Sequence, residues 1–142
     1  MTSSKQIKSK ISKEGLLTIS IEEVDIPQPN AGEVLIKVQA TPINPSDLGL
    51  LVGPADVSSL EIVEEGSKVQ MKVPESLIRS VSARFDQNLP VGNEGAGIVE
   101  AAGEGAEHLI GKVVGVAGGA MYSQYRCLPA SSCLEMNEGT SA

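Results

Sequence analysis

The feature that most constrains the fold is a run of glycines inside an apolar segment. From Gly92 to Gly103 the chain reads Gly-Asn-Glu-Gly-Ala-Gly-Ile-Val-Glu-Ala-Ala-Gly. Glycine inside a strand usually marks a bulge, or a point where another backbone or a ligand comes close. The segment therefore predicts a bulged strand over residues 91–102 that packs closely against a neighbour.

The spacing of these glycines excludes a nucleotide-binding loop. A dinucleotide fingerprint is G-x-G-x-x-G between a strand and a helix. Here the order is G-x-x-G-x-G, and Ile98-Val99 continues a strand. A P-loop is also excluded, because no glycine is followed by Lys-Ser or Lys-Thr. Structural glycines at the corner of a barrel are the interpretation that remains.

Alternating apolar and polar residues predict further strands. They fall at residues 16–23, 33–40, 111–117 and 121–128. Short strands separated by glycine turns are typical of an all-β barrel or sandwich with small helices. No alternation of strands and helices appears along the chain, which argues against a doubly wound sheet.

A loop rich in turn residues, Thr41 to Asp47, follows the second of these strands. Asn44 lies between two prolines, which favours an Asx turn. Ser46 or Asp47 is suited to cap a short helix predicted over residues 48–52.

Residues 54–88 carry a weaker pattern. Residues 60–73 are consistent with a strand pair that turns at Gly66-Ser67. From Pro74 onward a short helix is predicted, with Leu77, Ile78, Val81 and Phe85 on one face.

Composition excludes two classes of partner. The chain has 142 residues, a net charge of −7 and only two tyrosines, one phenylalanine and no tryptophan. It therefore lacks both the basic surface and the aromatic faces of nucleic-acid-binding proteins. The lysines between positions 5 and 13 are interpreted as a solvated end. No apolar run is long enough for a bilayer and no signal peptide follows Met1, so a cytoplasmic protein is expected.

The cysteines and the histidine do not form a recognisable metal motif. Cys127 and Cys133 make no C-x-x-C pair, and His108 is the only histidine. Reduced, unreactive thiols are the simplest interpretation in a cytoplasmic protein. His108 is expected in a solvated turn.

Two segments together resemble the catalytic domain of the medium-chain dehydrogenase/reductase superfamily. Its zinc-dependent members carry G-H-E-x-x-G-x-x-x-x-x-G, and here Asn93 replaces the histidine that binds zinc. Their C-x-S/T-D loop reads Asn44-Pro45-Ser46-Asp47 in this chain, so the cysteine is replaced as well. The lobe of four cysteines that holds a structural zinc is missing. The chain is therefore most similar to the zinc-free quinone oxidoreductase branch, whose members show N-P-x-D.

The resemblance covers most of the chain and implies its architecture. Residues 1–142 would form a mainly β, GroES-like twisted barrel with a few short helices and no Rossmann domain. Residues 54–88 would be an insertion atypical of the family; a surface elaboration is the preferred interpretation, and a lid over the substrate cleft is the alternative. Residues 134–142 would begin the hinge to a cofactor domain that these residues do not include.

The resemblance also implies a function. The complete enzyme would use NADPH or NADH, without zinc, to reduce a quinone or a conjugated carbonyl, and it could be a homodimer. Asn44 would be the catalytic and cofactor-contacting residue. Asp47, Asn93 and Tyr122 would line the substrate cleft, with Tyr122 either a proton donor or a groove residue. Glu94 would have a structural role. The 142 residues alone are expected to be inactive.

Two alternatives remain open at this stage. Because the GroES-like barrel also occurs in co-chaperonins, a stand-alone binding or assembly module is one of them. The other is a truncated gene product or excised domain that keeps the fold without the activity.

Overall fold

The structure is a computed structural model that describes residues 2–142. It divides into two compact units, which are described one at a time. Unit 1 holds the described residues up to Gln6, together with Glu23–Ile43 and Gly92–Ala142. Unit 2 holds Ile7–Glu22 and Asn44–Val91.

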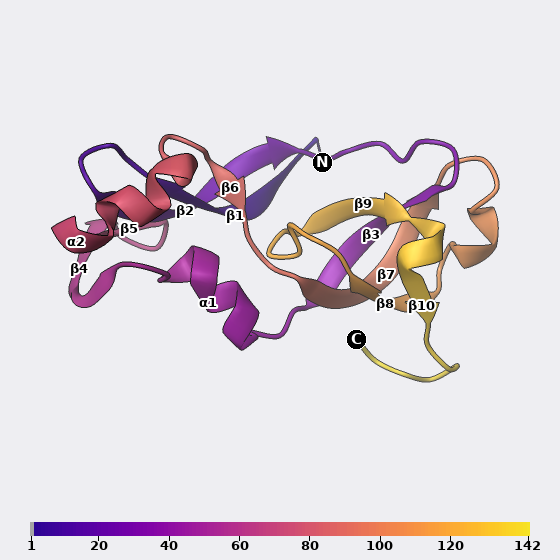
Figure 1. The fold of residues 1–142 in the computed structure, drawn as a ribbon. Helices are drawn as coiled ribbons and strands as arrows, with labels where there is room; N and C mark the ends of the chain where they lie inside the picture. The colour runs from indigo at the N-terminus through magenta and orange to yellow at the C-terminus, as the bar shows by residue number, and fades with distance from the viewer. Residues whose placement is uncertain (1) are drawn as a thin grey trace. The chain divides into compact units, whose positions relative to one another are not determined.

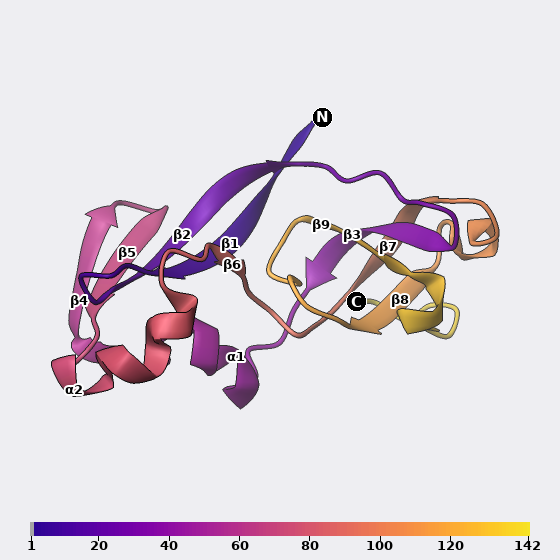
Figure 2. The ribbon, with the colours of Figure 1, turned by 45° about the horizontal axis from the view of Figure 1, so that its top comes forward.

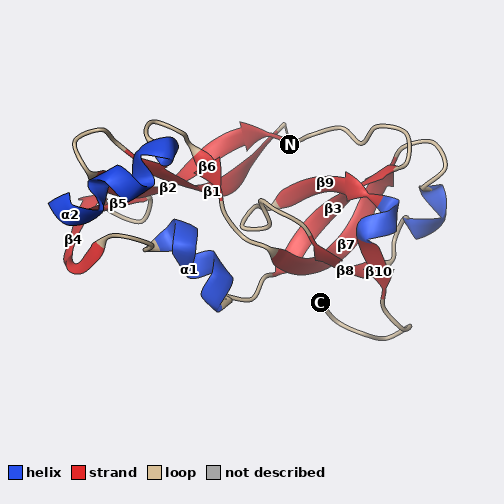
Figure 3. Ribbon diagram, viewed as in Figure 1, coloured by secondary structure: helices blue, strands red, loops and turns tan. Residues whose placement is uncertain are grey.

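Unit 1 is built on a five-stranded antiparallel sheet in the order β10-β8-β7-β3-β9 (Figures 1 and 3). Its strands are β3 (Glu33–Ala40), β7 (Glu94–Ala102), β8 (Val113–Ala117), β9 (Tyr125–Pro129) and β10 (Cys133–Glu135). Two 3-10 turns, η2 (Glu107–Leu109) and η3 (Ala130–Ser132), connect them.

The core of unit 1 is made of aliphatic side chains, as the lack of aromatic residues requires. The buried set is Val34, Ile36, Val99, Ala106, Leu109, Val114, Val116, Met121 and Leu128. Burial of an aliphatic side chain contributes about 1.5–3 kcal/mol. Six of these nine side chains come from β3, β7, β8 and β9, whereas Ala106, Leu109 and Met121 come from the connecting segments.

The glycine run folds as the bulged strand that its sequence predicts. Strand β7 pairs with β3, and the register shifts between Leu35 and Ile36 and again between Val38 and Ala40. A Cβ atom added to Gly97 would lie 2.1 Å from the carbonyl oxygen of Lys37. One added to Gly103 would lie 1.8 Å from the carbonyl oxygen of Asn30. Glycine is therefore needed at both positions, because the backbone at Asn30 and at Lys37 comes very close to them.

The second sheet is centred on unit 2, in the order β4-β5-β2-β1-β6 (Figure 2). Its strands are β1 (Ser3–Ile11), β2 (Leu16–Asp25), β4 (Asp56–Glu64), β5 (Lys68–Lys72) and β6 (Leu89–Pro90). The unit also holds helix α1 (Pro45–Leu51), helix α2 (Glu75–Ile78) and the 3-10 helix η1 (Arg79–Arg84).

One face of this sheet is apolar and forms the core of unit 2. Met71 lies opposite Leu17 in the pairing of β5 with β2, and both are buried. Ile11 and Val73 complete the buried cluster. The helical residues Ile78, Val81 and Phe85 pack against it, as their spacing predicts. Leu77, predicted to share this face, is instead 41% exposed, because α2 spans only four residues before the backbone tightens into η1.

Four local predictions need correction. The lysine-rich start of the chain is strand β1, not a solvated end, because buried Ser4, Ser9 and Ile11 anchor it between the lysines. Helix α1 begins at Pro45, three residues early, since proline is well suited to the first helical position. Strand β9 begins only at Tyr125. Strand β10 occupies the start of the expected hinge, because it pairs with β8.

The mainly β architecture is confirmed, and the two sheets are both antiparallel. The strand pair in the 54–88 segment is also confirmed as β4 and β5, with Gly66 at a positive φ in the turn between them. Among residues 2–142 no helix combines the length and the apolar character needed to cross a membrane.

We predict that Gly97→Ala destabilises unit 1 by roughly 2–4 kcal/mol, since the methyl group can be accommodated only by separating β7 from β3. Gly119→Ala is the matched control, because nothing lies within 4 Å of its Cβ position. Urea unfolding of both variants measures the difference. Equal stability of the two variants would contradict the close-approach explanation.

Candidate functional site

Unit 1 contains a cavity at one end of its sheet, with a volume of about 610 Å³. Its walls come from four places: the end of β3 and the loop after it, the start of β7, strand β8, and the segment around β10. The lining residues are Ala40, Thr41, Pro42, Glu94, Gly95, Ala96, Gly115, Val116, Ala117, Ser132, Leu134 and Met136. A mostly apolar cavity of this size is typical of a small-molecule site.

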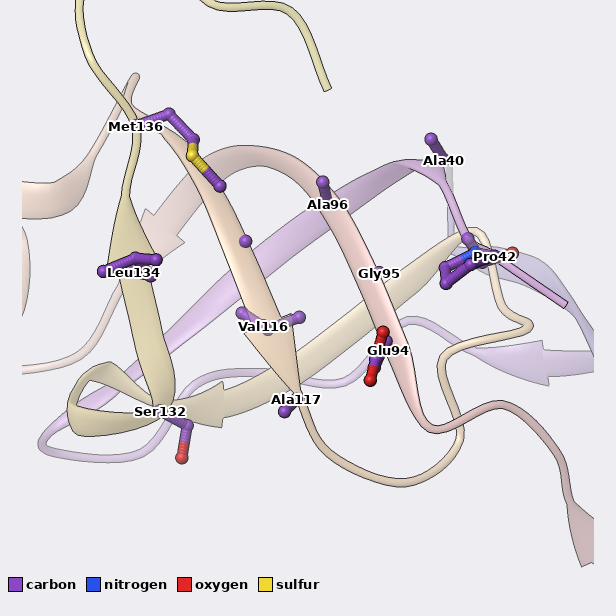
Figure 4. Close-up of a pocket in the computed structure, with 12 residues that line it drawn as sticks. Ala40, Pro42, Glu94, Gly95, Ala96, Val116, Ala117, Ser132, Leu134 and Met136 are labelled. Carbon is purple, nitrogen blue, oxygen red and sulfur yellow. The ribbon is translucent and has the colours of Figure 1, made fainter. Parts of the chain in front are cut away.

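The close-up in Figure 4 shows how the strands present these residues. Strands β10, β8 and β7 lie side by side, with Leu134, Val116 and Glu94 placed across them. A Cβ atom at Gly115 would lie 2.6 Å from the terminal methyl of Met136. Glycine at this position therefore leaves room for the Met136 side chain against β8.

Glu94 is the only titratable residue among the twelve that line the cavity. It is exposed and begins strand β7, opposite Ala117 of β8. The family motif predicts only a structural role for Glu94, and its place in the cavity lining is a feature that the motif does not predict. Its position immediately after Asn93 was the available signal.

Asn93 lies in the turn that leads into β7, and its side chain is not part of the cavity lining. The residue is exposed, and its carbonyl oxygen accepts a hydrogen bond from the backbone N–H of Gly118 at 2.8 Å. This bond ties the turn before β7 to the turn after β8. Asn93 is thus adjacent in the chain to the lining, and its predicted role in a substrate cleft stays a prediction.

Tyr122 supports the cavity wall from outside it. Its hydroxyl donates a hydrogen bond to the carbonyl oxygen of Pro42, a lining residue, at 3.0 Å. Its ring lies over Gly92, where an added Cβ would be 2.6 Å from the ring carbon Cδ1. Gly92 also has a φ of +101°, a conformation that other residues rarely adopt. Tyr122 therefore joins the loop after β3 to the turn before β7.

Asn44 and Asp47 lie together in unit 2, at the start of α1. Asn44 is the N-cap residue. Asp47 is 2% exposed, and its carboxylate accepts a hydrogen bond from the backbone N–H of Asn44 at 2.8 Å. The backbone N–H of Asp47 donates in turn to the carbonyl oxygen of Asn44 at 2.9 Å. The predicted capping role of Asp47 is confirmed, and a capping carboxylate also suits the positive end of the helix.

The four predicted site residues therefore form two pairs. Asn44 and Asp47 belong to unit 2, whereas Asn93 and Tyr122 belong to unit 1. In the sequence, Pro42, which lines the cavity of unit 1, is followed by Ile43 and then by Asn44, where unit 2 continues.

Metal-binding geometry is not found in the described part of the chain. Among residues 2–142 no group of three or more His, Cys, Asp or Glu side chains is placed to hold a metal ion. Cys127 and Cys133 are free thiols. Burial raises the pKa of both thiols, which lowers the fraction present as reactive thiolate.

We predict that Tyr122→Phe destabilises unit 1 by about 0.5–1.5 kcal/mol, because the carbonyl of Pro42 loses its donor. Tyr125→Phe is the matched control, since no hydroxyl bond of Tyr125 is found among the described residues. Urea unfolding gives the two free energies. A loss for Tyr122→Phe no larger than that for Tyr125→Phe would contradict a stabilising role for the Tyr122 hydroxyl.

Comparison with solved structures supports the same fold. The chain superposes on a putative NADPH:quinone reductase from Mesorhizobium loti with a TM-score of 0.61 and 20% identity, covering 99% of this chain and 38% of that one. For a short chain alcohol dehydrogenase from E. coli, complexed with NADH, the TM-score is 0.65 at 19% identity, with 99% and 40% covered. For human synaptic vesicle membrane protein VAT-1 homolog-like protein it is 0.64 at 18% identity, with 98% and 37% covered.

Sequence comparison identifies the family. A zinc-type alcohol dehydrogenase-like protein from Schizosaccharomyces pombe is 56% identical over 39 residues, which are 28% of this chain and 12% of that protein. The chain thus spans well under half the length of these relatives. The sequence pattern of the alcohol dehydrogenase GroES-like domain matches residues 30–138. The chain therefore belongs to the alcohol dehydrogenase GroES-like domain family.

Proposed function

We propose that these residues are the substrate-binding, catalytic domain of a nicotinamide-dependent oxidoreductase that reduces a quinone or conjugated carbonyl without zinc. The observation that carries the proposal is the apolar cavity of about 610 Å³, walled on one side by the loop that leads to Asn44. Membership of the family and the quinone reductase named among the similar structures support the reaction class.

The residues present suit a flat, uncharged ring better than a metal ion. The cavity offers mainly methyl, methylene and thioether groups, with Glu94 and Ser132 as its polar side chains. The resemblance aligns Asn44 and Asn93 with a cysteine and a histidine that bind zinc in related enzymes. A neutral carboxamide is a poor zinc ligand compared with a thiolate or an imidazole.

The reduced nicotinamide would supply the hydride, and the protein would orient the reacting groups. In this proposal the Asn44 carboxamide hydrogen-bonds the substrate carbonyl or the nicotinamide amide. Asp47 fixes the backbone of Asn44 from the first turn of α1. Within unit 1, Tyr122 holds the carbonyl of Pro42 and so fixes the loop after β3. Its hydroxyl is used as a donor in the structure, which favours a positioning role over proton transfer.

The residues that would bind the cofactor's pyrophosphate are not recognised here. No G-x-G-x-x-G between a strand and a helix occurs in the 142 residues. We therefore predict that these residues, purified alone, do not oxidise NADPH or NADH with a quinone. Absorbance at 340 nm follows the cofactor, and steady turnover by the purified chain would overturn this part of the proposal.

The reaction is tested on the protein as its gene encodes it, with NADPH, NADH, a naphthoquinone and an aliphatic enone. Asn44→Ser keeps a good N-cap residue but removes the carboxamide. We expect kcat/KM to fall about 100-fold, the order seen when one well-placed donor is lost. Asn137→Ser is the matched control, because Asn137 is exposed and lies outside the cavity lining. Unchanged kcat/KM in Asn44→Ser would remove Asn44 from the catalytic role.

The metal is tested separately on the same preparation. We expect elemental analysis to find far less than one zinc per chain, and dialysis against a chelator to leave the activity unchanged. One zinc per chain, with activity lost on its removal, would contradict the proposal, because two carboxamides would then have to be part of a zinc site.

A further inference from the structure

Arg84, the last residue of the 3-10 helix η1, binds the C-terminal end of α1, the helix whose N-cap is Asn44. Arg84 donates from Nη1 to the carbonyl oxygen of Gly49 at 3.2 Å and from Nη2 to the hydroxyl of Ser9 at 3.3 Å. The Ser9 hydroxyl donates to the carbonyl oxygen of Leu50 at 2.5 Å. Ser9 is fully buried, with 0% of its surface exposed. All these residues belong to unit 2, and the bond from Arg84 to Gly49 joins η1 to α1.

These contacts satisfy the carbonyl groups at the end of α1. The last turn of any helix leaves carbonyl oxygens without partners inside the helix. Here the carbonyl of Leu48 accepts hydrogen bonds from the N–H groups of Val52 and Gly53, at 2.9 and 2.7 Å. Arg84 and Ser9 donate hydrogen bonds to the next two carbonyl oxygens, those of Gly49 and Leu50. A cation at this end also suits the helix dipole.

The backbone around α1 leaves room for the guanidinium. Gly53 has a φ of +29°, and a Cβ added there would lie 2.3 Å from the carbonyl oxygen of Gly49 and 3.5 Å from Arg84 Nη1. Glycine at this position therefore keeps the Gly49 carbonyl open to Arg84.

The guanidinium group of Arg84 is partly buried. Burial lowers the pKa of Arg84, although an arginine remains protonated in proteins. Its Nε is buried with no hydrogen-bond partner among residues 2–142, and no ion pair to Arg84 is found there. Carbonyl and hydroxyl oxygens are thus the groups that compensate this charge.

We propose that Arg84, acting through Ser9 and α1, is a positioning residue for Asn44. Helix α1 has seven residues and is about 10 Å long, so its first and last turns are adjacent. Asp47 fixes Asn44 at its first turn, and the Arg84–Ser9 pair fixes its last turn. The segment 54–88, predicted as a surface elaboration, then has a role as a brace of the Asn44 loop. The consequence for catalysis rests on the proposed function, whereas the brace itself does not.

Hydrogen exchange of backbone amides tests the brace in the protein as its gene encodes it. We expect Arg84→Met to speed exchange at residues 48–53 by about tenfold or more, because the last turn of α1 loses a charged donor. Exchange in the β3–β7 pair, which belongs to unit 1, is expected to stay unchanged. Arg79→Met is the matched control, since Arg79 is an exposed residue of the same 3-10 helix.

Two further variants separate positioning from a general loss of stability. Ser9→Ala is expected to speed exchange at the same residues. The double variant Ser9→Ala/Arg84→Met is expected to exchange little faster than either single variant, because the two side chains belong to one hydrogen-bond network. Millimolar guanidinium is expected to restore slow exchange in Arg84→Gly but not in Ser9→Ala. Unchanged exchange at 48–53 in Arg84→Met, or an equal increase throughout unit 2, would overturn the proposal.

Enzyme kinetics then link the brace to Asn44. We expect kcat/KM with the enone to fall about tenfold in Arg84→Met and to recover partly in Arg84→Lys, which keeps the charge but not the fork of donors. An exchange effect without any change in kcat/KM would overturn the link to Asn44. If the wild-type protein shows no turnover, the proposed function fails, and the exchange measurements still decide whether Arg84 braces α1.

Discussion

The pairing of β7 with β3 in unit 1 depends on a close approach of their two backbones, at Gly97 and Lys37. A side chain at position 97 would lie 2.1 Å from the Lys37 carbonyl oxygen, so the two central strands pack at a distance that only glycine allows. Bulges on either side of this contact bend the strand pair. Because the two strands are antiparallel, the end of β3 lies next to the start of β7, where the cavity is found.

The cavity also depends on glycines at positions where a side chain would not fit. Gly95 and Gly115 line it directly, and each lies where a side chain would meet a methionine methyl group, that of Met121 or Met136. Methionine adapts well to irregular spaces. The result is an apolar wall with little bulk, closed on one side by a loop that Tyr122 holds through the carbonyl of Pro42. A wall of this kind can accept a flat ring, which is why the proposed reaction fits it.

Unit 2 shows a different way of fixing a functional residue. Helix α1 is too short to be stable by itself, since isolated helices under about 12 residues are marginal in water. Its stability comes instead from partners at both ends: Asp47 at the first turn, and Arg84 with Ser9 at the last. Asp47 is close to Asn44 in the sequence, whereas Ser9 and Arg84, which bind the other end of α1, lie far from it.

Local patterns in the sequence were enough to predict the strands at β2, β3, β7 and β8, the β4–β5 pair and the mainly β class. Alternation and glycine spacing act over a few residues, so they can be recognised without the fold. The same holds for the family, whose motifs are short and contiguous. The lysines at the start of the chain indicate a solvated end rather than strand β1, because two of the buried residues next to them, Ser4 and Ser9, are polar and give no apolar signal.

Only the tertiary structure decided which residues meet. The lining of the cavity combines four separate segments, so Glu94, Ser132 and Met136 could not be grouped from their spacing. The contact of Arg84 with Gly49 joins residues 35 positions apart, and that of Ser9 with Leu50 joins residues 41 apart. Sequence by itself determined the strands, the glycine contacts and the family, because these depend on local geometry. The cavity and the brace of α1 depend on long-range packing, for which one sequence carries no local signal.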